Sequence, residues 1–282
     1  MRADEAHRLE SVCGAPILVV GAPRSGTTLV QRTLLADPRC CGGQESHFFV
    51  SFGQVLRDFD RKRSMERAHG LACYWRRDDL VARLRALWSE TMSGVVAASP
   101  GAGLLIEKTP DHALWLDVIA EVLPDARVVH VVRDSRAVCA SLLAASRAPW
   151  GRAWAPRSAA AAARIWRAHV DAAERCTLPV HRVHFEELER EPLAVLRGLW
   201  SFAGLGASDE ALLACHRAAR SGEAAFVGTG EIARSAPEPA GFHRGADERA
   251  QLGWLDRRKV WRETGDVMLR LGYSQSRPGA RA

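Results

Sequence analysis

A Gly-rich loop near the start of the chain separates an apolar run from a segment of helical character. Ile17–Val20 is apolar and rich in β-branched residues, residues 21–28 read Gly-Ala-Pro-Arg-Ser-Gly-Thr-Thr, and helical character resumes over Leu29–Leu35. This order predicts a strand, a loop and a helix. Such a loop lets backbone N–H groups turn inward around an anion at the helix N-terminus. The chain is therefore restricted to folds in which a buried strand leads into an anion-binding turn.

The loop departs from the triphosphate-binding pattern GxxxxGK[ST] at one position. Gly21, Gly26 and Thr28 match the pattern, but Thr27 stands where the lysine is expected. That lysine serves the β- and γ-phosphates of a triphosphate, so its replacement favours a nucleotide with a single 5′-phosphate. Arg24 can supply positive charge from within the loop. Further hydrogen bonds to an anion can come from the hydroxyls of Ser25, Thr27 and Thr28.

Strands and helices alternate along the rest of the chain. Further strands are predicted over residues 104–106, 127–132 and 179–185, and helices over residues 111–123, 134–145, 159–175, 192–202 and 257–271. This alternation predicts the α/β class, with a P-loop-type, mainly parallel sheet covered by helices on both faces. Ligands of such sheets bind beyond the carboxyl ends of the strands. The loop 21–28, the segment 107–110 and Arg133 all follow strands, so we expect them to share one site.

The predicted domain organisation is simple. We expect one domain over residues 17–275 between an N-terminal tail (1–16) and a C-terminal tail (276–282). The domain contains a helical insertion at about 54–92 and a Gly- and Pro-rich, lid-like loop at about 221–253. No apolar stretch approaches the roughly 20 residues that span a membrane, and the polar N-terminus lacks the apolar core of a signal peptide.

Charge and cysteine usage narrow the function classes. The net charge is +6, yet the basic residues are spread over the chain, which favours a polyanionic small molecule over nucleic acid as the ligand. Only three of the 39 basic residues are lysines, namely Lys62, Lys108 and Lys259. A lysine retained in such a chain indicates a need for a compact ammonium group, and we apply this argument to Lys108.

The seven scattered cysteines include no CxxC pair, which predicts no zinc cluster, no disulfide framework and a cytoplasmic location.

Two motifs together resemble one enzyme family. The loop 21–28 is similar to the 5′-phosphosulfate loop of sulfotransferases that use 3′-phosphoadenosine 5′-phosphosulfate (PAPS). The second family motif is a strand ending in arginine and a following helix with a serine, here Arg133 and Ser141. The resemblance implies that these two residues bind the 3′-phosphate of the nucleotide. It runs from Ile17 to Tyr273 and is closest to the bacterial and protein-tyrosine-sulfating branch, which has PRSGTT in the loop, a following Glu and an EKTP-like segment.

The resemblance also implies catalytic roles. Glu45 is the expected general base, with His47 as the rival that the sequence leaves open. Lys108 is expected to stabilise the bridging oxygen of the leaving group, and Arg24 to act as a second cation. The alternative for Lys108 is a structural salt bridge to Glu107 or Asp111. The expected reaction needs no metal and releases adenosine 3′,5′-bisphosphate (PAP).

Two other functions compete with this interpretation. A P-loop kinase or NTPase would hold Mg²⁺ on Asp134, although the missing lysine at Thr27 argues against a triphosphate. A non-catalytic nucleotide-binding module would tolerate the loss of Glu45 and Lys108. The expected acceptor is the hydroxyl of a small molecule, natural product or glycolipid, because the Arg- and Ala-rich composition suggests a GC-rich bacterial source. Whether the protein forms a homodimer stays open.

Overall fold

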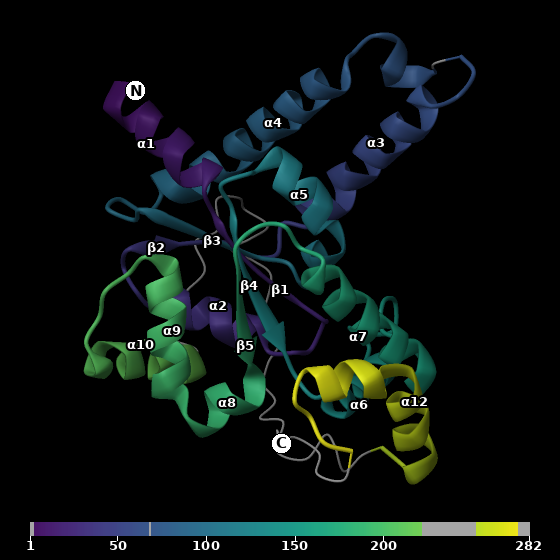
Figure 1. The fold of residues 1–282 in the computed structure, drawn as a ribbon. Coiled ribbons are helices and arrows are strands. Elements are labelled where there is room, and N and C mark those ends of the chain that lie inside the picture. The colour runs from purple at the N-terminus through teal and green to yellow at the C-terminus, as the bar shows by residue number, and fades with distance from the viewer. Residues whose placement is uncertain (1–2, 68, 222–251, 276–282) are drawn as a thin grey trace.

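The computed structural model describes residues 3–67, 69–221 and 252–275. Its centre is a five-stranded sheet in the order β2-β3-β1-β4-β5, in which all neighbouring strands are parallel (Figure 1). The strands are β1 (Ile17–Gly21), β2 (Cys40–Cys41), β3 (Leu104–Lys108), β4 (Arg127–Val132) and β5 (Val180–His184).

Helices cover both faces of this sheet, which confirms the predicted α/β class with a parallel sheet. The α-helices are α1 (Ala3–Gly14), α2 (Thr27–Leu35), α3 (Phe48–Arg63), α4 (Arg77–Ala97), α5 (Leu116–Val122), α6 (Ser135–Arg147), α7 (Ala159–Glu174), α8 (Phe185–Arg190), α9 (Pro192–Ala203), α10 (Asp209–Ser221) and α12 (Trp254–Arg270). The 3₁₀ helices are η1 (Gly70–Cys73) and η2 (Pro110–Trp115).

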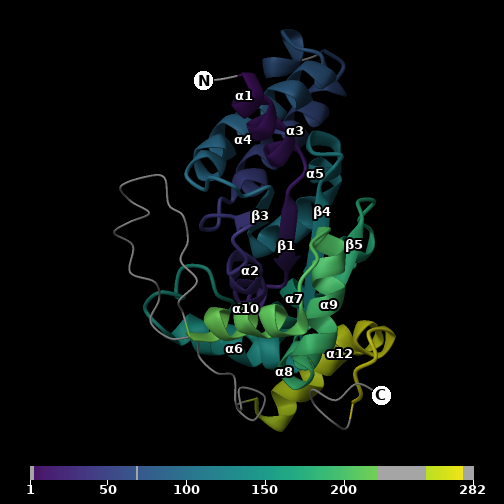
Figure 2. The ribbon, with the colours of Figure 1, turned by 90° about the vertical axis from the view of Figure 1, so that its left-hand side faces the viewer.

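The central strand β1 is apolar at every position because both of its faces are buried. Leu18 and Val20 belong to a core shared with α3, α4 and α5, whereas Ile17 and Val19 belong to a core shared with α2, α9 and α10. Successive side chains of a strand point to opposite faces, so a strand covered twice reads as a continuous apolar run. Figure 2 shows α9 and α10 together on one side of the molecule, away from α3, α4 and α5.

The strand register brings the expected site segments to one edge of the sheet. Val19 pairs with Lys108 of β3, and Gly21 pairs with Val131 of β4. The chain leaves β1, β3 and β4 at neighbouring carboxyl ends, where the loop after Gly21, Lys108 and Arg133 lie. The edge predicted to bind the ligand is therefore formed by three adjacent strands.

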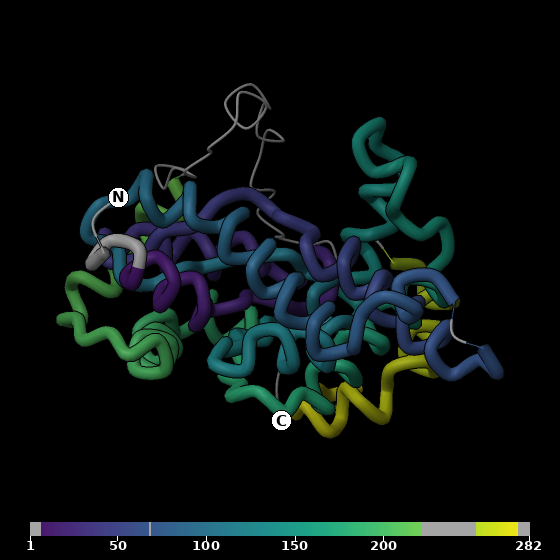
Figure 3. Tube along the Cα trace, turned by 90° about the horizontal axis from the view of Figure 1, so that it is seen from above, coloured from purple at the N-terminus to yellow at the C-terminus, as the bar shows by residue number. Residues whose placement is uncertain are grey.

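Residues 3–14 of the predicted N-terminal tail form helix α1. This helix packs along α4 (Figures 1 and 3). The indole Nε1 of Trp88 donates a hydrogen bond of 2.8 Å to the carbonyl of Cys13. Arg8 donates to the carbonyl of Val96 at 3.3 Å. No helix was predicted over residues 3–14 because this segment is polar, and the contacts with α4 stabilise it.

Other predicted elements differ in detail. The insertion at 54–92 is a pair of helices, α3 and α4, joined through η1, and the predicted helix 111–123 divides into η2 and α5. Cys40–Cys41, for which no strand was predicted, pairs with β3 as the edge strand β2. Helices α8 and α10 were not predicted either. Of the predicted lid, residues 222–251 lie outside the described residues, as does the C-terminal tail 276–282.

Candidate active site

The loop after β1 adopts the backbone geometry of an anion cradle. Arg24 and Gly26 have φ values of 75° and 101°, in the left-handed region. Gly26 is the N-cap of α2 and no side chain caps that helix, so its first backbone N–H groups point toward the loop. A Cβ on Gly26 would lie 2.3 Å from the ring of Phe185, which explains the glycine at this position. The orientation of these amides and the helix dipole both favour an anion.

Ser25 provides an independent sign that the loop binds a polar group. Its side chain is only 1% exposed, and its Oγ has no hydrogen-bond partner among the described residues. A buried hydroxyl without a partner is costly unless a ligand satisfies it. The phosphate end of a nucleotide fits this orphaned donor, and Thr27 and Thr28 stand beside it at the start of α2.

Arg24 connects the loop to the second motif. Its Nε donates a hydrogen bond of 3.0 Å to the Oγ of Ser141 on α6, and Nη1 of Arg133 donates to the Arg24 carbonyl at 3.3 Å. The carbonyl of Arg133 in turn accepts a bond of 2.9 Å from the indole of Trp166. The guanidinium of Arg133 lies 4.5 Å from the ring centroid of Phe185. The predicted residues of the two motifs thus converge at one place.

Asp134, the Mg²⁺ ligand in the competing kinase interpretation, instead caps a helix and pairs with Arg136. It caps α6, accepting from the backbone N–H of Arg136 at 2.8 Å, and its carboxylate binds the Arg136 guanidinium through two bonds of 3.0 and 2.8 Å. Its side chain is fully buried. This pairing leaves Asp134 poorly placed to hold a divalent cation. Within the described ranges, no three His, Cys, Asp or Glu side chains form a metal-binding group.

A second buried carboxylate, Glu186, supports the Arg133 segment. Glu186 accepts the backbone N–H of Asp134 at 2.9 Å and the hydroxyl of Tyr273 at 2.8 Å. Burial raises the pKa of Glu186, against the lowering effect of these hydrogen bonds. The contacts of Glu186 and Phe185 give the segment after β5 a structural role beside Arg133 and Gly26.

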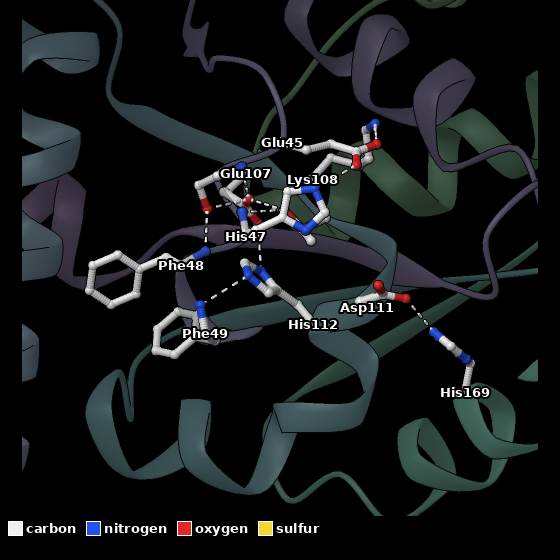
Figure 4. Close-up of polar contacts among 11 residues, drawn as sticks. Glu45, His47, Phe48, Phe49, Glu107, Lys108, Asp111, His112 and His169 are labelled. Carbon is white, nitrogen blue, oxygen red and sulfur yellow. Dashed lines mark hydrogen bonds and ion pairs between the residues drawn. The ribbon is translucent and has the colours of Figure 1, made fainter. Parts of the chain in front are cut away.

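Glu45 and Lys108 meet at the carboxyl end of β3, together with His47 (Figure 4). Lys108 Nζ forms an ion pair with Glu45 Oε1, and His47 Nε2 lies 3.3 Å from Glu45 Oε2. The side chain of Lys108 is 6% exposed, whereas that of Glu45 is 37% exposed. A largely buried ammonium group therefore faces the candidate base, and the base is open to solvent. The structure brings both candidates for the base, Glu45 and His47, to the same point.

The salt bridges that the sequence offered as alternatives for Lys108 do not form. Glu107 precedes Lys108 in β3, so its side chain points to the opposite face of the sheet, where it binds His112 with an Nδ1–Oε2 distance of 2.9 Å. Asp111 instead pairs with Nε2 of His169 on α7, at 2.9 Å. The hydrogen bond from His169 holds the pKa of Asp111 below its usual value, although burial opposes the shift.

Trp150 and Trp154 lie between α6 and α7 and are not core residues. Their side chains are 47% and 49% exposed, and their ring centroids are 5.8 Å apart. The guanidinium of Arg24 lies 5.6 Å from the ring centroid of Trp150. This exposed aromatic pair therefore adjoins the loop 21–28.

Two of the solved structures that share this fold are sulfotransferases. The chain matches sulfotransferase STF9 from Mycobacterium avium with a TM-score of 0.55 and 15% identity, covering 96% of this chain and 80% of that one. It matches mouse sulfotransferase SULT7A1, complexed with PAP, with a TM-score of 0.57 and 12% identity, covering 95% of this chain and 90% of that one. At these sequence identities, the similarity to both structures establishes the fold alone.

Sequence comparison supplies the family. The nodulation protein NoeE of Sinorhizobium fredii is 29% identical over 137 residues, which make up 47% of this chain and 31% of that protein. The chain thus spans about a third of the length of this curated relative. The model of the sulfotransferase family matches residues 16–209, a region that contains β1, the loop 21–28, Lys108, Arg133 and all five strands. With most of the chain covered by that match, the protein belongs to the sulfotransferase family.

Proposed function

We propose that the protein transfers a sulfuryl group from PAPS to the hydroxyl of a small-molecule acceptor and releases PAP. The observation that carries this proposal is the convergence of two cation-bearing motifs at the loop 21–28, with the Glu45–Lys108 pair at the carboxyl end of β3, the strand next to β1. The groups proposed for donor binding and for proton transfer then lie at the same edge of the sheet.

The donor half of the site is built to bind two phosphate groups. The N–H groups at the start of α2, with the hydroxyls of Ser25, Thr27 and Thr28, bind the 5′-phosphosulfate end. Arg133 and Ser141 bind the 3′-phosphate, Arg133 through the planar guanidinium that suits phosphate oxygens. The orphaned Oγ of Ser25 and the uncapped N-terminus of α2 support this assignment, because both need an external acceptor.

The acceptor half of the site carries the transfer. The acceptor oxygen attacks sulfur in line with the bond to the 5′-phosphate, the new S–O bond forms as the old one breaks, and the electron pair stays on the phosphate oxygen. Glu45 accepts the hydroxyl proton, with His47 next to it as the alternative base. Lys108 and Arg24 stabilise the charge that develops on the transferred group and the leaving oxygen. The pairing of Lys108 with Glu45 supports these roles because it sets the cation and the base next to each other.

The acceptor and the compartment are the finer parts of the proposal. We assign the acceptor to bacterial small molecules, natural products or glycolipids, with Trp150 and Trp154 as an aromatic surface beside Arg24. The buried thiols of Cys13 and Cys139, neither of which forms a disulfide, fit the reducing cytoplasm. No helix in the described part of the chain is long and apolar enough to cross a membrane.

A donor assay with ³⁵S-labelled PAPS tests the proposal. The protein is incubated with labelled PAPS and fractions of a bacterial lysate, and with a panel of phenols, sugars and glycolipids, while PAP release is measured in parallel. We expect PAP and labelled product to appear in equal amounts without added Mg²⁺. Lys108→Ala, which removes the ammonium group, should abolish most of the transfer. Strict dependence on Mg²⁺ with turnover of ATP would support a kinase or NTPase instead.

A further inference from the structure

The carboxylate of Glu107 is buried near the candidate active site and accepts four hydrogen bonds, and the chemistry proposed above does not use it. Its side chain is 3% exposed. Oε1 accepts three hydrogen bonds, from the Ser46 N–H at 3.2 Å, the Ser46 hydroxyl at 2.8 Å and the Thr109 hydroxyl at 2.7 Å. Oε2 accepts from Nδ1 of His112 at 2.9 Å (Figure 4).

Two of these partners extend the network to further backbone groups of the same loop. Thr109 Oγ1 accepts the N–H of His47 at 3.2 Å, and Nε2 of His112 accepts the N–H of Phe49 at 3.2 Å. Glu107 therefore holds three backbone N–H groups: that of Ser46 directly, and those of His47 and Phe49 through one side chain each. All three lie within residues 46–49. This stretch immediately follows Glu45 and leads into α3.

The loop needs such an anchor because its backbone is strained. His47 has a φ value of 49°, in the left-handed region that residues with a Cβ rarely adopt, and it is the N-cap of α3 without a side-chain cap. A residue in this region is strained, and the conformation persists only where its surroundings impose it. The bonds centred on Glu107 supply that constraint from the neighbouring strand β3.

The hydrogen bonds of His112 determine which of its ring nitrogens carries the proton that faces Glu107. Because His112 Nε2 accepts the N–H of Phe49, the proton of the imidazole must lie on Nδ1, which donates to Glu107. Burial opposes ionisation of Glu107, but His112, Thr109 and Ser46 outweigh burial and hold its pKa below the usual value. Glu107 is thus an acceptor-only carboxylate with four donors.

We infer that Glu107 is a positioning residue that sets the direction of Glu45 and His47 toward Lys108, rather than only a stabilising core acid. This inference rests on the proposed function, because the quantity it affects is proton transfer to Glu45 or His47. Glu107 does so through Ser46, Thr109 and His112, and it contacts neither Glu45 nor Lys108 in the bonds described. Loss of the network should misplace the candidate base, and a displacement of about 1 Å can lower a rate by about 100-fold.

Glu107→Gln is the sharpest variant, because it conserves shape but breaks one specific connection. If its amide oxygen keeps the three donors on the Oε1 side, its NH₂ group faces Nδ1 of His112. The imidazole must then carry its proton on Nε2, which opposes the N–H of Phe49. Asp37→Asn is the matched control: Asp37 is also a buried carboxylate with several donors, and it lies just before β2, away from the carboxyl ends of the strands that carry the site.

The test compares Glu107→Gln, Ser46→Ala and Asp37→Asn with the unaltered protein. Two measurements are made: hydrogen exchange of the peptide covering residues 44–50, and the rate of transfer from ³⁵S-PAPS to 4-nitrophenol or to the acceptor found in the panel. PAP affinity serves as the check of folding. We expect faster exchange in that peptide for Glu107→Gln, and to a smaller degree for Ser46→Ala. We also expect kcat to fall by about 100-fold and by several-fold, respectively, with PAP affinity within about twofold, while Asp37→Asn changes none of these values below its melting temperature.

The outcomes separate the inference from the proposed function. Unchanged exchange in the peptide 44–50 for both Glu107→Gln and Ser46→Ala overturns the inference, whatever the activity. Faster exchange with an unchanged kcat overturns it too, since Glu107 would then only stabilise the loop. If Glu107→Gln does not fold, Ser46→Ala carries the same two measurements. If the unaltered protein transfers no sulfuryl group, the proposed function fails, and the exchange data alone show whether Glu107 orders the loop.

Discussion

Nε of Arg24 donates a hydrogen bond of 3.0 Å to the Oγ of Ser141, although 117 residues separate them in the chain. The bond joins the loop after β1 to the helix after β4. These are the two segments that carry the recognised motifs, and each alone indicates only that an anion binds. Their direct contact places the two groups of residues proposed to bind phosphate next to each other, as a nucleotide with phosphates at both ends requires.

Substitutions of Arg133 and Ser141 should therefore change the affinity for the nucleotide more than the rate of transfer. We expect Arg133→Ala to weaken PAP binding by about 10- to 100-fold, since a hydrogen bond to a charged group contributes about 1.5–3 kcal/mol. Ser141→Ala should weaken it by a smaller factor, about two- to tenfold. Isothermal titration with PAP measures both, and adenosine 5′-monophosphate, which lacks the 3′-phosphate, is the control ligand. An equal loss of affinity for both nucleotides would contradict the assignment to the 3′-phosphate.

Glu45 and His47 can be distinguished because only one of them needs to accept the proton. Glu45→Gln keeps the shape of the side chain and should lower kcat by about 10²–10⁴-fold, the usual contribution of a general base. His47→Gln should lower it much less while leaving the Glu45–Lys108 pair intact. Single-turnover rates at saturating PAPS give both values. A larger loss in His47→Gln than in Glu45→Gln would assign the base to His47.

A glycine is required at position 26 by the left-handed backbone conformation and by the nearby ring of Phe185. Gly26→Ala should destabilise the protein by about 1–2 kcal/mol for the left-handed backbone alone, and further because its Cβ would lie 2.3 Å from Phe185. Chemical denaturation measures the change in the free energy of unfolding. In the background of Phe185→Ala, the steric part should vanish and the backbone part should remain. Full recovery of stability in that background would show that φ at Gly26 imposes no strain.

Asp37 gives the stability of the protein a defined dependence on pH. The hydrogen bond from Arg39 lowers the pKa of Asp37 to about 2, against the opposing effect of burial. A carboxyl group whose pKa is lower in the folded protein stabilises it fully above the unfolded value of about 3.9, and this contribution is lost as the pH falls toward about 2. Asp37→Asn should cost about 1–3 kcal/mol at pH 7.

The same comparison at lower pH isolates the ionisation. Urea denaturation of both proteins between pH 7 and the acid limit of folding should show their difference in stability constant above about pH 5 and shrinking below it. A difference that does not change with pH would mean that the Asp37→Asn substitution removes packing contacts rather than a charge interaction.

Sequence patterns predicted the elements whose physical cause is local. The apolar run of β1 and the glycines of the loop 21–28 read correctly because double burial and left-handed φ values restrict the residue types directly. The same holds for β4, which appears in the structure at the predicted residues 127–132. Helices α1 and α10 and the edge strand β2 were missed, because they are short or polar and depend on partners distant in sequence.

The sequence by itself determined the parallel α/β fold and the anion-binding loop, and it identified every residue proposed for donor binding and catalysis. It could not determine which charges pair. Lys108 has Glu107 before it and Asp111 three residues after it in sequence. Its partner is nevertheless Glu45, because the alternation of side chains along β3 turns Glu107 to the other face. The four-donor site around Glu107 likewise brings together Ser46 and His112, which lie on different elements. Such contacts depend on the packing of strands and helices in three dimensions, and only the tertiary structure decided them.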